Sequence, residues 1–120
     1  MSSIVSYIKV IAVKYDPVNY PLDTTSQLVR TYTDAVTSAD SIAVYFNGQM
    51  IPEITTQTPS TFSKFYYSTT IVTGTSPSIT FTITANQNFL NPDYNSATPA
   101  ILGFTSKDLI YIEYTYQVTV

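Results

Sequence analysis

Apolar and polar residues alternate along several segments of the chain, which is the pattern of β-strands that bury one of their two faces. The alternation is most regular over residues 78–85 and 109–120. In the first segment the apolar set is Ile79, Phe81 and Ile83, and the outward set is Thr80, Thr82 and Thr84. Because successive strand residues point to opposite faces, we predict a half-buried strand in each of these segments.

Residues 4–15 form a β-branched run that is apolar on both faces of the strand it predicts. The first face carries Val5, Tyr7, Ile11 and Val13, and the second carries Ile4, Ile8, Val10 and Ala12. A strand with two apolar faces is either buried between layers or covered by a partner molecule. The segment is therefore an inner strand of a sandwich or a strand used in assembly. The second reading makes Ile4, Ile8 and Val10 candidate interface residues.

Asn47 and Gly48 interrupt an apolar run and predict a β-hairpin over residues 41–51. Asn-Gly is the preferred pair for a two-residue type I′ turn, because both central residues need a positive φ. The turn fixes which residues of the flanking strands face each other. Pro52 follows closely and limits the second strand to a sheet edge or to a short length.

Three further segments complete the predicted architecture. Residues 24–39 fit either a strand over 27–33 or a single helix, because their apolar spacing suits both. Residues 62–70 predict an aromatic strand. Residues 86–103 collect proline, glycine, asparagine and serine, and predict a long loop.

These segments together predict one all-β domain over residues 1–120. The expected fold is an antiparallel β-sandwich of jelly-roll or immunoglobulin-like type, with about seven or eight strands and at most one short helix.

The hairpin region also resembles a known module. Residues 37–48, Thr-Ser-Ala-Asp-Ser-Ile-Ala-Val-Tyr-Phe-Asn-Gly, are similar to a unit repeated in tail-fibre, neck and head-decoration proteins of tailed bacteriophages. In that unit an aromatic strand, an alternating strand and a closing strand follow, which here correspond to residues 62–70, 79–83 and 108–114. The order of these pieces over roughly residues 37–116 carries the resemblance. The long loop before the closing strand departs from the module.

The resemblance implies a non-enzymatic virion structural protein, such as a head-decoration, head-fibre, neck or tail-fibre component. Such a protein acts by oligomeric β-sheet assembly and by docking on a viral particle. Its expected location is the virion, after synthesis in the host cytoplasm, and its expected partners are other virion proteins. The apolar terminal strands also favour a homo-oligomer, either a dimer or a trimer.

The composition narrows the possible functions. Charged residues make up 11% of the chain, less than half of the usual share of about 25%. The net charge is −3, and the five basic residues are scattered, so we expect no binding to nucleic acid. The low charge leaves little repulsion between copies of the chain, which favours assembly.

The chain contains neither His nor Cys, which excludes Ser/His/Asp and Cys/His nucleophilic catalysis. The Asp residues stand at predicted turns and loops and show no EF-hand spacing. We therefore expect no enzymatic activity, no cofactor and no metal. No apolar run approaches the roughly 20 residues that span a bilayer, and no signal-peptide pattern is present, so we expect no membrane partner.

The chain has eleven tyrosines, and they allow a second functional hypothesis. Exposed Tyr side chains suit protein interfaces and stack on sugars, although Tyr is also a good strand former. Tyr66 and Tyr67 are neighbours on one predicted strand, and Tyr94 lies in the long loop. We include these three as candidate interface residues. The alternative function is a small carbohydrate-binding or adhesin-type module that uses Tyr-bearing loops, with a host-surface glycan as its ligand.

Overall fold

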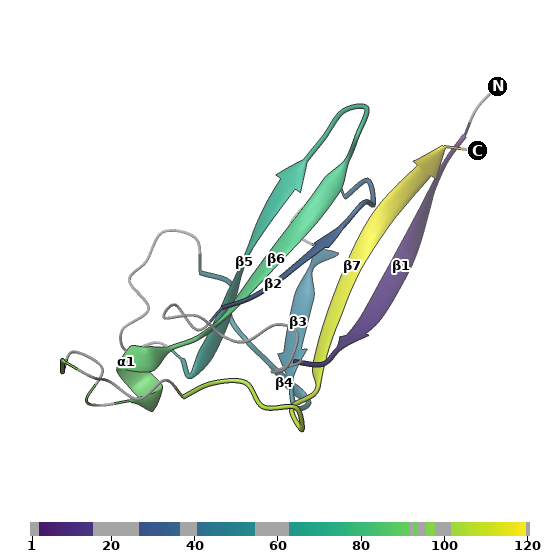
Figure 1. Ribbon diagram of the computed structural model, residues 1–120. Coiled ribbons are helices and arrows are strands. Elements are labelled where there is room, and N and C mark those ends of the chain that lie inside the picture. Colours follow the sequence, from purple (N-terminus) through teal and green to yellow (C-terminus); the bar gives the residue numbers. More distant parts are fainter. Residues whose placement is uncertain are drawn as a thin grey trace.

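The computed structural model describes residues 3–15, 27–36, 41–54, 63–91, 93, 96–97 and 102–119. Seven strands in this part of the chain form two antiparallel sheets (Figure 1). Sheet A contains β1 (Ile4–Val13), β7 (Ile110–Thr119), β3 (Ala43–Phe46) and β4 (Gln49–Met50), in that spatial order. Sheet B contains β2 (Gln27–Tyr32), β6 (Ser78–Ala85) and β5 (Phe65–Val72). With one short helix, α1 (Gln87–Leu90), this confirms the predicted all-β sandwich.

The strands pair in a nested order along the chain. β1 pairs with β7, and β2 pairs with β6, so the beginning of the chain lies beside its end. Ile4 is opposite Thr119 at one end of the β1–β7 ribbon, and Val13 is opposite Ile110 at the other. In an immunoglobulin constant-type sandwich the first strand pairs with the second instead, so this nesting separates the chain from that topology.

The core lies between the two sheets and is built from the alternating apolar sets. Its fully buried members are Val44, Ile79, Phe81, Ile83, Ile110, Ile112 and Tyr114. Burial decreases along the β1–β7 ribbon towards its outer end. There Tyr7 and Val118 belong to the inward-facing set, yet they are 46% and 38% exposed. The ribbon therefore extends beyond the packed part of the sandwich.

Residues 27–32 form a strand, which decides between the strand and the helix that the sequence allowed. β2 pairs with β6 in a register that places Leu28 opposite Ile83 and Tyr32 opposite Ile79. Leu28 is only 2% exposed. Pairing with a central strand and burial of one face outweigh the helical spacing, which was the weaker pattern in a Thr-rich segment.

The β3–β4 hairpin turns at Asn47 and Gly48, whose φ values of 50° and 87° are those that a type I′ turn requires. The Asn47 side chain accepts a hydrogen bond from the Leu109 backbone N–H at 2.8 Å and donates one to Asp108 at 3.0 Å. β4 ends before Pro52, and the chain then crosses to sheet B. There the Pro52 carbonyl accepts from the Tyr67 backbone N–H at 3.0 Å.

We expect the Gly48→Val variant to lose about 1–3 kcal/mol of stability, the usual cost of a strained backbone. A Cβ atom at Gly48 would meet nothing within 4 Å, so the loss comes from the positive φ and not from a clash. Urea unfolding followed by circular dichroism measures the change. Gly48→Asn is the matched control and should cost less, because Asn tolerates this conformation. Equal stability of all three proteins would contradict the turn geometry.

The long loop after β6 is fastened at its base. Asn86 caps α1 by accepting from the Asn88 backbone N–H. The Gln87 side-chain amide bonds to both the carbonyl and the N–H of Leu102. Asn86 and Gln87 are buried, and so is Asn91 at the end of the helix. These amides explain why residues near a polar loop pack as part of the core.

Candidate functional site

β1 is an edge strand. It stands at the end of sheet A, and β7 is its only neighbour among the strands that the structure describes (Figure 1). Its outward-facing residues Ile4, Ile8 and Val10 are 67%, 71% and 61% exposed. The sequence allowed an inner strand of the sandwich or a strand used in assembly, and the prediction of an inner strand is therefore wrong. The position that remains is an apolar strand at the edge of the molecule.

The exposed residues of β1 continue into a larger apolar surface across sheet A. The β1–β7 and β3–β7 registers place Ala12, Tyr111 and Tyr45 in one row, and Met50 extends that row on β4. We define the apolar outer face of sheet A by its apolar members Ile4, Ile8, Val10, Ala12, Ala43, Tyr45, Met50 and Tyr111; the same side of the sheet also carries Ser6, Thr115, Gln117 and Thr119. Glu113 is the one ionisable carboxylate within these rows, opposite Val10 and Ala43. Exposed apolar side chains gathered on one side of a sheet in this way are typical of interaction sites.

The outer face of sheet B has a different chemistry. Its registers align hydroxyl side chains, which we call the hydroxyl face of sheet B: Thr31, Ser68, Thr70, Thr80, Thr82 and Thr84. Thr31 and Thr80 are joined by a hydrogen bond of 3.0 Å between their hydroxyl oxygens. The outer face of sheet A thus exposes more large apolar side chains than that of sheet B, where Val29 and Val72 are the exposed ones among the described residues. The sequence places Thr84 in the outward set of its strand, and the structure agrees on its direction, but its side chain is buried and not exposed to solvent.

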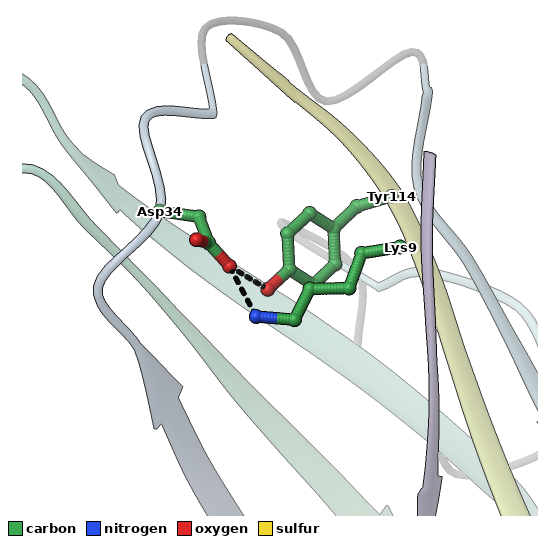
Figure 2. A network of polar contacts seen from close by, with 3 residues as sticks. All are labelled: Lys9, Asp34 and Tyr114. Atoms are coloured by element: carbon green, nitrogen blue, oxygen red, sulfur yellow. Dashed lines mark hydrogen bonds and ion pairs between the residues drawn. The ribbon is translucent and has the colours of Figure 1, made fainter. Parts of the chain in front are cut away.

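The free edge of β1 lacks two of the features by which proteins usually prevent edge pairing, which are prolines and a very short strand, but it carries a third, an inward-pointing charge. β1 is ten residues long and contains no proline. Its single charged residue, Lys9, belongs to the inward-facing set. There the Lys9 ammonium binds the Asp34 carboxylate at 2.9 Å (Figure 2). Because this one charge is paired within the sandwich, and because no other described strand lies beyond β1, the edge can accept another strand as far as the described residues show.

Lys9, Asp34 and Tyr114 form a cluster that fixes β1 to the rest of the sandwich. Asp34 lies just after β2, and its Oδ2 accepts from Lys9 and, at 2.5 Å, from the Tyr114 hydroxyl (Figure 2). The Lys9 ammonium also lies 5.8 Å from the ring centroids of Tyr32 and Tyr116. The cluster joins one residue from each of β1 and β7 to the chain that leaves β2. It holds the edge strand in place while leaving its outer side chains exposed.

The electrostatics of the cluster follow from these contacts. Burial disfavours the Asp34 carboxylate, but the hydrogen bonds from Tyr114 and Lys9 outweigh burial and hold the pKa of Asp34 below its usual value. The hydrogen bond that Lys9 donates to Asp34 raises the pKa of Lys9. Burial, followed by the bond to Asp34, raises the pKa of Tyr114 far above its ordinary value. All three groups are thus kept in their neutral-pH forms.

The two described tyrosine candidates, Tyr66 and Tyr67, lie on β5 and not on β1. Tyr67 is 5% exposed and belongs to the core, so its side chain is not available to a partner. Burial, with a contribution from Glu53, raises the pKa of Tyr67 to about 12. Tyr66 is half-buried and faces outward on sheet B, opposite Thr84. Tyr94 lies outside the described residues. The structure brings Ile4, Ile8 and Val10 together on sheet A but joins none of the described tyrosine candidates to them.

A depression of about 570 Å³ lies near the β3–β4 turn. Aromatic side chains contribute much of its lining, namely Phe46, Phe65 and Phe89, and Lys64 supplies its cation. Elsewhere in the described ranges, no group of three or more acidic, His or Cys residues is placed to hold a metal ion. Nor does any helix in that part of the chain have the length and apolarity needed to cross a membrane.

Comparison of the chain with protein-family models, with curated proteins and with solved structures finds no match. The similarity to the bacteriophage module therefore stays a prediction from the sequence.

Proposed function

We propose that this chain is a non-enzymatic structural protein of a virion that works by oligomeric β-sheet assembly and by docking on a viral particle. The observation that carries the proposal is the apolar outer face of sheet A, which ends at the open edge of β1. Edge strands of this length with exposed Ile and Val side chains pair readily with another chain. The virion setting is supported by the resemblance of the hairpin region to modules of bacteriophage particles.

The contrast between the two outer faces supports an attached protein with a defined orientation. Desolvation of the apolar face of sheet A is favourable, at about 25 cal/mol per Å² of apolar surface removed from water. The hydroxyl face of sheet B gains less from being covered, because its side chains would lose hydrogen bonds with water. Sheet A would therefore face the assembly, and sheet B would face the solvent.

Sedimentation velocity tests the self-association. We expect the full-length protein to sediment as a dimer or trimer at high micromolar concentration. The double variant Ile8→Ser/Val10→Lys should sediment as a monomer, because it places a hydroxyl and a charge on the outer side of β1. Val29→Ser/Val72→Lys is the matched control, since Val29 and Val72 are exposed valines of sheet B. A full-length protein that stays monomeric would contradict the self-association.

Mass spectrometry of particles purified from cells that carry the gene tests the virion location. We expect the protein to band with the particles in a density gradient, and the Ile8→Ser/Val10→Lys protein to remain in the unbound fractions. Detection of the protein in the lysate but not in the particle fractions would overturn this part of the proposal.

The carbohydrate-binding alternative receives less support from the described residues. Tyr67 is buried, and Tyr66 is half-buried on a sheet face and does not lie on a loop. Saturable binding of the isolated monomer on a glycan array would nevertheless favour this alternative over assembly.

A further inference from the structure

We infer that β1 pairs antiparallel with β1 of a second copy. The twofold axis that relates the two strands lies midway between the two Ile8 residues. This inference deepens the proposed homo-oligomeric assembly and rests on it. The pairing would join two copies of sheet A into one continuous sheet. It would also satisfy the backbone N–H and C=O groups that an edge strand leaves unpaired.

A second copy fits this edge because the edge is compatible with itself. A twofold interface brings the same surface of both subunits together, so each residue must tolerate its own symmetry mate or a nearby residue. β1 contributes no charge on its outer side, and its single charged residue, Lys9, points inward and binds Asp34. With the axis perpendicular to the sheet, the apolar outer faces of both copies lie on the same side and form one surface.

The alternation of side chains restricts the register. Directly opposed residues in an antiparallel pair point to the same face of the sheet. With a twofold axis perpendicular to the sheet, the central residue of β1 must therefore lie opposite the same residue of the second copy. Ile8 and Lys9 are the two central positions of β1. If the axis lay between the two Lys9 residues, their ammonium groups would be opposite each other, and like charges in that arrangement are destabilising.

With the axis between the two Ile8 residues, the two Lys9 residues are no longer opposite each other, and residues 4–12 of both strands are paired. It places Ile8 opposite Ile8 of the second copy, and Ile4 opposite Ala12 of the second copy. On the inner side, Lys9 faces Tyr7 of the second copy. Tyr7 is 46% exposed and stacks on Tyr116 with ring centroids 5.7 Å apart. Because Lys9 already lies over Tyr116, the second Tyr7 ring would add another aromatic neighbour to the same cation.

The experiment uses single-cysteine variants, because the chain has no cysteine of its own. Ile8→Cys should form a disulfide-linked dimer with itself under mild oxidation, since directly opposed residues lie within disulfide reach. Ile4→Cys and Ala12→Cys should each link poorly alone. Their like residues would be about 27 Å apart at ~3.4 Å per residue along the strand. An equimolar mixture of the two should give about tenfold more covalent dimer than either alone, because a disulfide needs Cα atoms within about 7 Å.

The outcomes separate this inference from the proposed function. Strong self-linking of Ile4→Cys or Ala12→Cys, with no gain on mixing, would overturn the twofold register. A dimer in sedimentation with no cross-link at any of the three positions would overturn edge pairing and leave oligomeric assembly standing. A protein that cross-links as expected but is missing from purified particles would overturn the virion role alone. Val29→Cys, on the outer face of sheet B, is the control and should stay unlinked.

Discussion

The Asp34→Ala variant is expected to lose about 1.5–3 kcal/mol of unfolding free energy, the range for hydrogen bonds to a charged group. Asp34 is the shared acceptor for Lys9 and Tyr114, so alanine leaves both without their partner. Tyr114 is fully buried, and its hydroxyl would then be an unsatisfied donor in the core. The Lys9 side chain is 39% exposed, so water replaces much of its lost interaction.

Chemical denaturation of a small set of variants measures this effect. Lys9→Met keeps the length of the side chain and should cost less than Asp34→Ala, because the Tyr114 bond survives. Tyr114→Phe keeps the ring and removes one hydroxyl. The double variant Asp34→Ala/Tyr114→Phe should then be more stable than the sum of the two single losses predicts, since residues in one network are coupled. Strict additivity would show that the bond between Asp34 and Tyr114 contributes nothing.

Alkaline pH is expected to destabilise the protein progressively between about pH 10, the ordinary tyrosine pKa, and pH 12. The pKa of Tyr67 is raised to about 12, and the pKa values of Tyr32, Tyr114 and Lys9 are raised as well. The folded state thus holds these protons more tightly than the unfolded chain does. The resulting stability is present below the unfolded pKa values and is lost as the pH rises towards the folded ones.

Urea unfolding at a series of alkaline pH values measures this loss, and ultraviolet absorbance of tyrosinate follows the ionisation directly because the chain has no Trp. We expect part of the tyrosinate signal to appear only together with loss of the circular-dichroism spectrum. Tyr67→Phe and Tyr114→Phe should each weaken the pH dependence. An unfolding free energy that stays constant up to pH 12 would contradict the assigned burial of these hydroxyls.

The faces of the strands could be predicted from the sequence because alternation reports burial directly. Ile79, Phe81 and Ile83 are all fully buried, as the pattern over residues 78–85 predicts. For β1 the sequence separated the two apolar sets but not which of them is buried; the structure shows that Val13 is buried and Ile8 is exposed. Alternation, however, describes one strand at a time and contains no information on which strand lies next to it. The position of β1 at the edge of sheet A therefore needed the structure.

The Lys9–Asp34–Tyr114 cluster was missed for a related reason. Lys9 is one of five scattered basic residues in the sequence, and Asp34 suited a turn. Their contact joins residues 25 positions apart and depends on how the chain leaves β2. One signal was available in advance. Lys9 belongs to the set of β1 that also holds Ile11 and Val13, and a lone cation on a core-facing set needs a partner.

The nested pairing of β1 with β7 also determines how the sandwich would bear mechanical load. Because Ile4 lies opposite Thr119, force that separates these two residues would peel the ribbon open, breaking its cross-strand hydrogen bonds one pair after another. Force directed along β1 would instead shear all of these bonds at once, a mode that resists much larger loads. The β1–β7 ribbon is therefore weak when it is pulled apart at its outer end and strong when it is pulled along the edge strand.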